Sequence, residues 1–133
     1  MEALRKIVPA ESFGDTEKKI NGFKAGFGTL LYYTDTRATQ QLVDQFPPYA
    51  HNFPIWAQQE NGMLQFVIWA GLEEMGLGAS LQHYTELIEE DIRKELNIPE
   101  NLKMVAQMPF GSKLKEADPK DFVRLEERVK ILK

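Results

Sequence analysis

The pattern of apolar and polar positions divides the chain into alternating helices and strands. The clearest helix is predicted over Trp56–Met75, and Gly76 suits the left-handed residue just past a helix end. The run Thr29–Tyr33 combines β-branched, aliphatic and aromatic residues between Gly28 and Asp35, which is typical of a buried strand.

The remaining elements are weaker but follow the same alternation. In chain order they are one or two short helices over Glu2–Phe23 broken near Pro9 and Gly14, a helix over Thr36–Phe46, an ordered loop over Pro47–Pro54, a short strand running into a loop over Leu77–Tyr84, a helix over Leu87–Leu96, a strand over Leu102–Phe110 and a weakly alternating last strand over Leu125–Leu132. Three or four strands interleaved with helices favour an α+β or α/β domain, in which helices cover a sheet.

The Trp56–Met75 helix is unusual because its segment Phe66–Leu72 is apolar on every side. A helix of this kind must be covered all round. Two interpretations remain open: a second copy of the chain provides part of the cover, or the helix is the central core helix of a monomer.

Length and composition exclude several classes of protein. A chain of 133 residues predicts a single domain over residues 1–133. The absence of cysteine excludes disulfides and thiolate chemistry, and with only two histidines, His51 and His83, we expect no metal site. The longest apolar stretch, Phe66–Leu72, is far too short to span a membrane, and the first residues lack the apolar core of a secretion signal. We therefore expect a soluble, cytoplasmic protein without membrane contact.

Charge argues against nucleic acid as a partner and singles out the last residues. The net charge is −4, whereas non-specific nucleic-acid binding depends on neutralising phosphates. Residues 112–133 nevertheless carry seven basic and five acidic residues, a net charge of +2. This segment is either a solvated tail or a local site for a single phosphate.

Few residues offer chemistry of their own. Gly76 and Gly78 follow a helix and precede a strand, the reverse of the order in a phosphate-binding loop, and the carboxylates and serines show no catalytic pattern. The segment Ser80–Tyr84 stands out because it carries an amide, an imidazole and a phenol in consecutive residues. It is either a polar loop or a site for a flat heteroaromatic ligand.

Six blocks of sequence, in order, closely resemble the flavin-dependent nitroreductase family, in its branch of small bacterial and fungal proteins. The blocks are Phe46–Trp56, Gly62-Met63, Gly76–Tyr84, Asn97-Ile98-Pro99, Ala106–Gly111 and Leu125–Val129. The resemblance covers nearly the whole chain. It implies an α+β sandwich in which helices flank a central, mostly antiparallel sheet.

The resemblance also implies a cofactor, a partner and a reaction. Family members are intertwined homodimers with two FMN sites at the subunit interface. Ser80, Leu81, Gln82, His83 and Tyr84 would run along the flavin ring, where backbone amides stabilise negative charge. Near the C-terminus, Arg128 is the first choice and Arg124 the second for the FMN phosphate. NAD(P)H would reduce FMN, and a nitroaromatic or quinone-like acceptor would then take the electrons in a ping-pong cycle. No side chain is assigned a catalytic role.

One departure from the family pattern shapes these expectations. Family members begin with an Arg/Ser motif for the flavin phosphate and a Ser/Asn/Gln-rich loop, and this chain enters the pattern after both. We therefore expect the C-terminal portion of the family domain, incomplete at its N-terminus. The chain is a fragment, a shortened gene product or a genuine small relative. The alternative function is a non-catalytic dimerising or flavin-binding module that has lost part of the FMN site.

Overall fold

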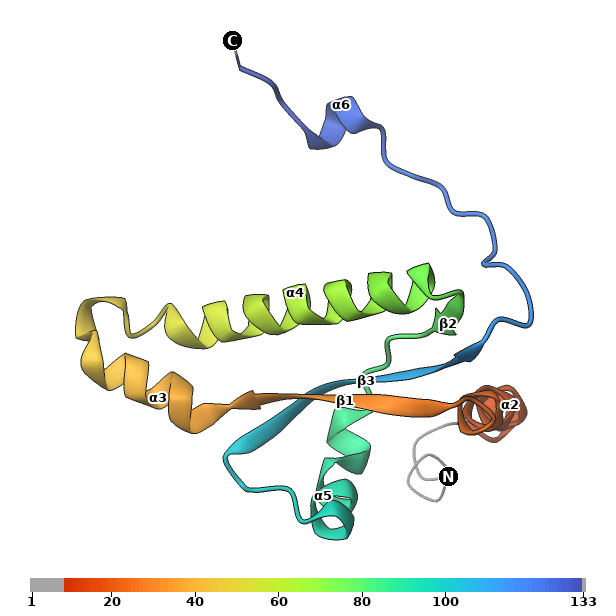
Figure 1. Cartoon of the computed structure of the whole chain (residues 1–133), viewed down its shortest axis with the longest axis horizontal. Helices are drawn as coiled ribbons and strands as arrows, with labels where there is room; N and C mark the ends of the chain where they lie inside the picture. The colour runs from red at the N-terminus through yellow and green to blue at the C-terminus, as the bar shows by residue number, and fades with distance from the viewer. Residues whose placement is uncertain (1–8, 133) are drawn as a thin grey trace.

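The computed structural model describes residues 9–132, which form a small antiparallel sheet with helices on both faces (Figure 1). The elements are η1 (Ala10–Ser12), α2 (Phe13–Lys24), β1 (Gly28–Asp35), α3 (Thr36–Gln45), η2 (Pro47–Tyr49), α4 (Phe53–Glu74), β2 (Leu77–Ala79), α5 (Thr85–Leu96), β3 (Leu102–Ser112) and α6 (Leu125–Arg128). The predicted α+β class is confirmed.

The sheet has the strand order β1-β3-β2, so the last strand in sequence lies between the other two. Both pairings are antiparallel. The β1–β3 register pairs Tyr32 with Ala106 and Tyr33 with Met104. Val105 is therefore an extra residue in β3, and the strand carries a bulge there.

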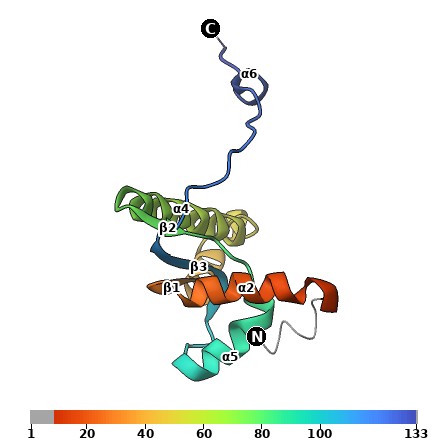
Figure 2. The ribbon, with the colours of Figure 1, turned by 90° about the vertical axis from the view of Figure 1, so that its right-hand side faces the viewer.

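Helices cover the two faces of the sheet unequally. The long helix α4 lies on one face, and α2 and α5 lie on the other (Figures 1 and 2). The core forms between α4 and the sheet, where the buried Tyr32, Ala106 and Met108 meet Ile68 and Leu72. The predicted strands over Thr29–Tyr33 and Leu102–Phe110 thus form the centre of the domain.

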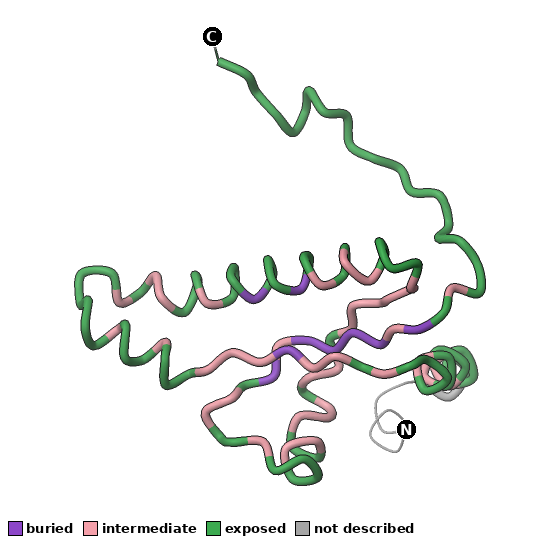
Figure 3. Tube along the Cα trace, viewed as in Figure 1, coloured by how far each residue is buried: buried purple, intermediate pink, exposed green. Residues whose placement is uncertain are grey.

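The helix α4 buries polar residues and exposes apolar ones. Asn61 and Gln65 are buried, whereas Met63, Phe66 and Val67 are 63%, 72% and 65% exposed. Figure 3 shows this helix as mostly exposed, with short buried stretches on the side that faces the sheet. The described chain therefore leaves part of the helix uncovered, whereas the core-helix interpretation requires cover on every side.

Residues 113–132, which follow β3, form an arm that extends away from the sheet (Figure 1). The strand predicted over Leu125–Leu132 is wrong: Leu125–Arg128 form the short helix α6, and residues 129–132 form no strand. A strand needs a neighbour for its hydrogen bonds, and no strand of the described domain runs alongside the arm. The arm exposes all seven of its large apolar residues, which are Leu114, Phe122, Val123, Leu125, Val129, Ile131 and Leu132.

Several predicted element boundaries change. The helix break predicted near Gly14 is wrong, because α2 begins at Phe13 and continues through that glycine, whose cost in a first turn is small. The part of the first predicted helix over residues 2–8 lies outside the described residues. The helix predicted from Trp56 begins at Phe53, since Pro54 is tolerated in a first helical turn. No helix within residues 9–132 is both long and apolar enough to cross a bilayer.

Candidate functional site

The segment Ser80–Tyr84 extends the sheet beyond the end of β2. The Ser80 amide donates to the Pro109 carbonyl (3.0 Å), and the Gln82 amide donates to the Gln107 carbonyl (2.7 Å). The Gln107 amide donates back to the Gln82 carbonyl (2.9 Å). The segment predicted as a loop is therefore extended backbone that pairs along one side with β3.

The opposite side of this segment is an open edge. Successive N–H groups of an extended chain alternate in direction, so the Leu81 and His83 amides face away from β3. Neither amide donates to any other atom within residues 9–132. Unpaired backbone donors at a sheet edge are available to a ligand or to another chain. The edge thus offers two parallel donors.

Side chains of the segment line hollows on the face covered by α2 and α5. Gln82 and Tyr84 line a cavity of about 720 Å³ between the sheet, α2 and α5, and Ser80 lines a neighbouring hollow of about 440 Å³. The larger cavity is mainly apolar, with walls that include Ile20, Phe23, Leu31, Ile88 and Ile92. A cavity of this size and lining suits a flat organic molecule with a few polar groups.

The other two residues of the segment point elsewhere. Leu81 packs against the core on the α4 side, and the side chain of His83 is exposed. The five residues predicted as one site are thus contiguous in space, but their side chains are shared between two faces. The feature common to the five residues is the unpaired backbone edge that they offer to a ligand.

A buried glutamine supports the segment, and the sequence analysis did not single it out. The side-chain oxygen Oε1 of Gln107 accepts from the Tyr84 amide (2.8 Å), and its Nε2 donates to Thr85 Oγ1 (3.0 Å). The available signal was a lone amide in the otherwise apolar run Met104–Phe110. Its spatial neighbours could not be read from that run.

The two predicted phosphate ligands lie far from this edge within one chain. Arg124 and Arg128 lie at α6, and this part of the arm is remote from β2 and α5 in both views (Figures 1 and 2). Arg124 pairs with Glu126 at the surface (3.4 Å). The structure therefore brings Ser80–Tyr84 together and leaves the two arginines separate from them in the same chain.

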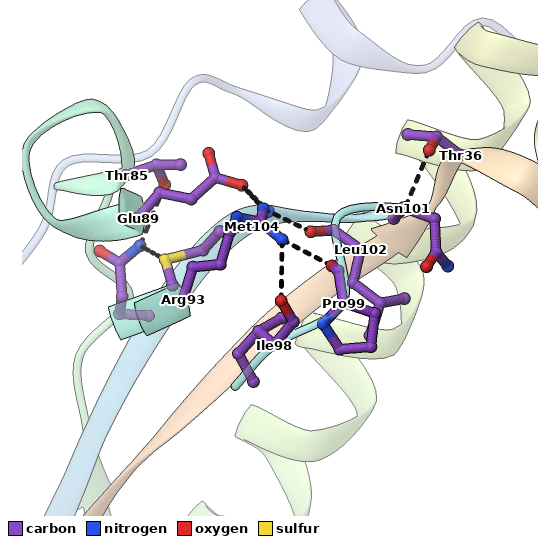
Figure 4. Close-up of polar contacts among 10 residues, drawn as sticks. Thr36, Thr85, Glu89, Arg93, Ile98, Pro99, Asn101, Leu102 and Met104 are labelled. Atoms are coloured by element: carbon purple, nitrogen blue, oxygen red, sulfur yellow. Dashed lines mark hydrogen bonds and ion pairs between the residues drawn. The ribbon is translucent and has the colours of Figure 1, made fainter. Parts of the chain in front are cut away.

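A third arginine, Arg93, lies near the end of α5 with its side chain 11% exposed, and both of its terminal nitrogens donate hydrogen bonds (Figure 4). Arg93 pairs with Glu89 (2.7 Å) and donates to the carbonyls of Ile98, Pro99 and Leu102. Glu89 also accepts from the Met104 amide (3.1 Å). These bonds fix the turn between α5 and β3, so Arg93 has a structural role.

The Tyr33 phenol lies close to this ion pair. The pKa of Tyr33 is raised, and burial of the phenol is the largest cause. The charge of Arg93 opposes this shift, and the charge of Glu89 adds to it. The hydroxyls of Tyr33 and Thr34 are buried without a hydrogen-bond partner in the described chain. Among residues 9–132, no group of three histidine, aspartate or glutamate side chains gathers as a metal site requires.

Comparison with known proteins assigns most of the chain to one family. The family described as "Nitroreductase family" matches residues 2–112. The chain belongs to this nitroreductase family. The expected resemblance is thereby confirmed, and the flavin-binding residues stay predictions.

Individual relatives show how much of the family domain the chain contains. It is 36% identical to HBN1 of Saccharomyces cerevisiae over 98 residues, which is 74% of this chain and 50% of HBN1. It is 31% identical to the nitroreductase FRM2 of the same yeast over 97 residues, which is 73% of this chain and 49% of FRM2. The chain thus spans about half the length of these curated relatives.

Among solved structures, nitroreductase CinD from Lactococcus lactis in complex with chloramphenicol superposes with a TM-score of 0.85 at 41% identity. The match covers 92% of this chain and 65% of that chain. CinD in complex with 4-nitrophenol superposes with a TM-score of 0.84 at 42% identity, covering 96% and 68%. The nitroreductase-like fold follows from these matches.

Proposed function

We propose that the chain is an FMN-dependent NAD(P)H oxidoreductase of the nitroreductase type, which reduces nitroaromatic or quinone-like acceptors by two electrons in a ping-pong cycle. Bound FMN would supply the redox chemistry, taking a hydride from NAD(P)H and passing electrons to the acceptor. The observation that carries the proposal is the open edge at Leu81 and His83, beside an apolar cavity, in a chain of this family.

The residues present fit the ring of FMN. The two outward amides are preorganised donors, and such donors stabilise negative charge where it develops. Gln82 and Tyr84 offer polar side chains next to apolar walls, which suits one face of a flat aromatic ring. The CinD structures hold chloramphenicol, 4-nitrophenol or nicotinic acid, all small aromatic molecules, which supports an aromatic acceptor here.

The proposed phosphate ligands would act on the flavin site of a second copy of the chain. Arg128 and Arg124 are the proposed phosphate ligands, and both lie on an arm that makes little contact with its own domain. The exposed apolar side of α4 offers a surface for a homodimer, and the apolar residues of the arm offer a means of holding the partner. In such a dimer, each arm carries its arginines to the site of the other subunit.

The decisive experiment measures FMN binding and turnover by the purified chain. The purified chain is mixed with excess FMN, and its visible spectrum, melting temperature and NADH- or NADPH-driven reduction of 4-nitrophenol are recorded. The proposal expects a yellow protein, a melting temperature that rises with FMN concentration and parallel double-reciprocal kinetics. A folded, colourless chain that FMN does not stabilise would exclude autonomous catalysis.

A second function is favoured by the length comparison. A chain that spans about half of its relatives could keep the dimer surface of α4 without a complete flavin site. It would then be a non-catalytic dimerising or flavin-binding module. Dimerisation without any FMN-dependent rise in melting temperature identifies the dimerising module, and FMN binding without turnover identifies the flavin binder.

A further inference from the structure

The side chain of Gln107 lies in the most buried part of the sheet. It is 3% exposed, and its neighbours Ala106 and Met108 are 0% exposed. Burying an amide is costly unless hydrogen bonds replace those that it made to water. The partners of this amide therefore indicate its role.

Most polar contacts of Gln107 go to the candidate segment or to Thr85, the residue that follows it. Its backbone exchanges two hydrogen bonds with Gln82, its Oε1 accepts from the Tyr84 amide, and its Nε2 donates to Thr85 Oγ1. The remaining contact joins Nε2 to the sulfur of Met104 (3.1 Å). Gln107 thus holds this segment from Gln82 to the start of α5.

The bulge at Val105 explains why a side chain is needed. After the pair Gln82–Gln107, the antiparallel pattern would next join the Tyr84 amide to the Val105 carbonyl. That carbonyl instead accepts from Thr85 Oγ1 (3.2 Å). The Gln107 Oε1 takes its place as acceptor for the Tyr84 amide, so the ladder continues past the bulge through a side chain.

We propose that Gln107 is a positioning residue for the flavin site. By anchoring the amides on both sides of His83, at Gln82 and Tyr84, it keeps this stretch extended and the His83 amide turned outward. The destination of that amide, the flavin ring, rests on the proposed function. The anchoring itself does not, because it is a property of the chain alone.

The first test needs no cofactor. In Q107M the side chain keeps its approximate volume but loses the acceptor for the Tyr84 amide. Tyr84 amide exchange, followed by NMR and compared at matched global stability, is expected to be about tenfold faster than in the wild type. Q65M is the matched control, because Gln65 is also buried and donates through its amide to Asn61 (2.6 Å), on α4 across the sheet. Equal Tyr84 exchange in Q107M and Q65M would overturn the proposal.

A milder variant covers the case in which Q107M does not fold. T85V removes the acceptor for Gln107 Nε2 and the donor to Val105, and leaves the bond to Tyr84 in place. A severalfold faster Tyr84 exchange is expected, and an unchanged rate would count against the anchoring role.

The second test uses the FMN-loaded chain. Loss of directed donors should make the midpoint potential of the bound flavin more negative and weaken FMN binding in Q107M, while Q65M, which leaves the open edge in place, does not shift the potential. An unchanged potential in Q107M overturns the role toward the flavin. If the wild type binds no FMN, the proposed function fails, and Tyr84 exchange alone decides whether Gln107 anchors the segment.

Discussion

The side-chain amide of Asn61 donates a hydrogen bond to the backbone carbonyl of Tyr33, 3.1 Å away. Asn61 also accepts from Gln65, one helical turn later (2.6 Å). These bonds tie the polar side of α4 to β1 next to the bulge, and they orient the rest of the helix. The side opposite Asn61 then carries Met63, Phe66 and Val67 outward.

This orientation predicts a dimer that one charge disrupts. In sedimentation velocity the wild type is expected to be a dimer, and F66E is expected to be a monomer, because a carboxylate would be buried without a partner. N21E is the control, since it adds the same charge at an exposed position of α2. A wild type that stays monomeric at high micromolar concentration would contradict the prediction.

The Arg93 network predicts a large stability loss from a single change. R93M keeps the apolar stem but removes the cation paired with Glu89 and the Arg93 hydrogen bonds to three carbonyls, so we expect a loss of about 3 kcal/mol in the free energy of unfolding. Urea denaturation measures this change. K18M removes an exposed partner of Asp15 and should change little. Similar values for the two variants would refute a structural role for Arg93.

Asp35 predicts a specific dependence of stability on pH. Its carboxylate caps α3 by accepting from the Arg37 amide (2.9 Å), and it accepts from Asn101 (2.8 Å). The Asn101 bond is the largest cause that lowers the pKa of Asp35 below its ordinary value of 3.8. A lowered pKa adds stability above the unfolded-state value, and this stability is lost as the pH falls through the folded-state value.

We therefore expect the stability difference between wild type and D35N to be largest near neutral pH and to shrink below about pH 4, as urea denaturation at several pH values would show. N101A should raise the pKa of Asp35 in an NMR titration of the carboxyl carbon. A difference between wild type and D35N that does not vary with pH would show that the charge contributes nothing.

Two glycines predict opposite effects of the same substitution. A Cβ on Gly26 would lie 2.6 Å from the Phe110 carbonyl oxygen, whereas a Cβ on Gly22 meets nothing within 4 Å. G26A should destabilise the fold by about 1–3 kcal/mol through this clash. G22A, within α2, should stabilise it by about 0.5–1 kcal/mol. Thermal unfolding compares the two, and an equal sign of effect would show that the close approach at Gly26 relaxes freely.

The parts of the fold that depend on local pattern could be predicted from the sequence. The runs at Thr29–Tyr33 and Leu102–Phe110 form the two long strands, and the apolar stretch within Trp56–Met75 forms α4. The arm could not be predicted in the same way. Leu125–Leu132 alternates weakly, but a strand depends on a neighbour that the described domain does not place there.

The candidate site was predictable as a segment and not as a geometry. The polar residues of Ser80–Tyr84 marked it, but the direction of its free amides depends on pairing with β3. The bond between Gln107 and Tyr84 depends in turn on the bulge at Val105, which no spacing in either segment indicates. In the proposed dimer, Arg124 and Arg128 would reach the site of a second chain, and no pattern within one sequence encodes that geometry.

The exposed lysines and arginines of the arm make trypsin a probe of whether a partner covers the arm. Lys115, Lys120, Arg124 and Arg128 are exposed beyond the last strand, where trypsin can reach them in an isolated subunit. A partner that covers the arm would protect these peptide bonds from trypsin. The rate of tryptic cleavage therefore measures the fraction of chains whose arm is covered. The same trimming would remove both arginines proposed for the phosphate and leave the sheet and α4 whole.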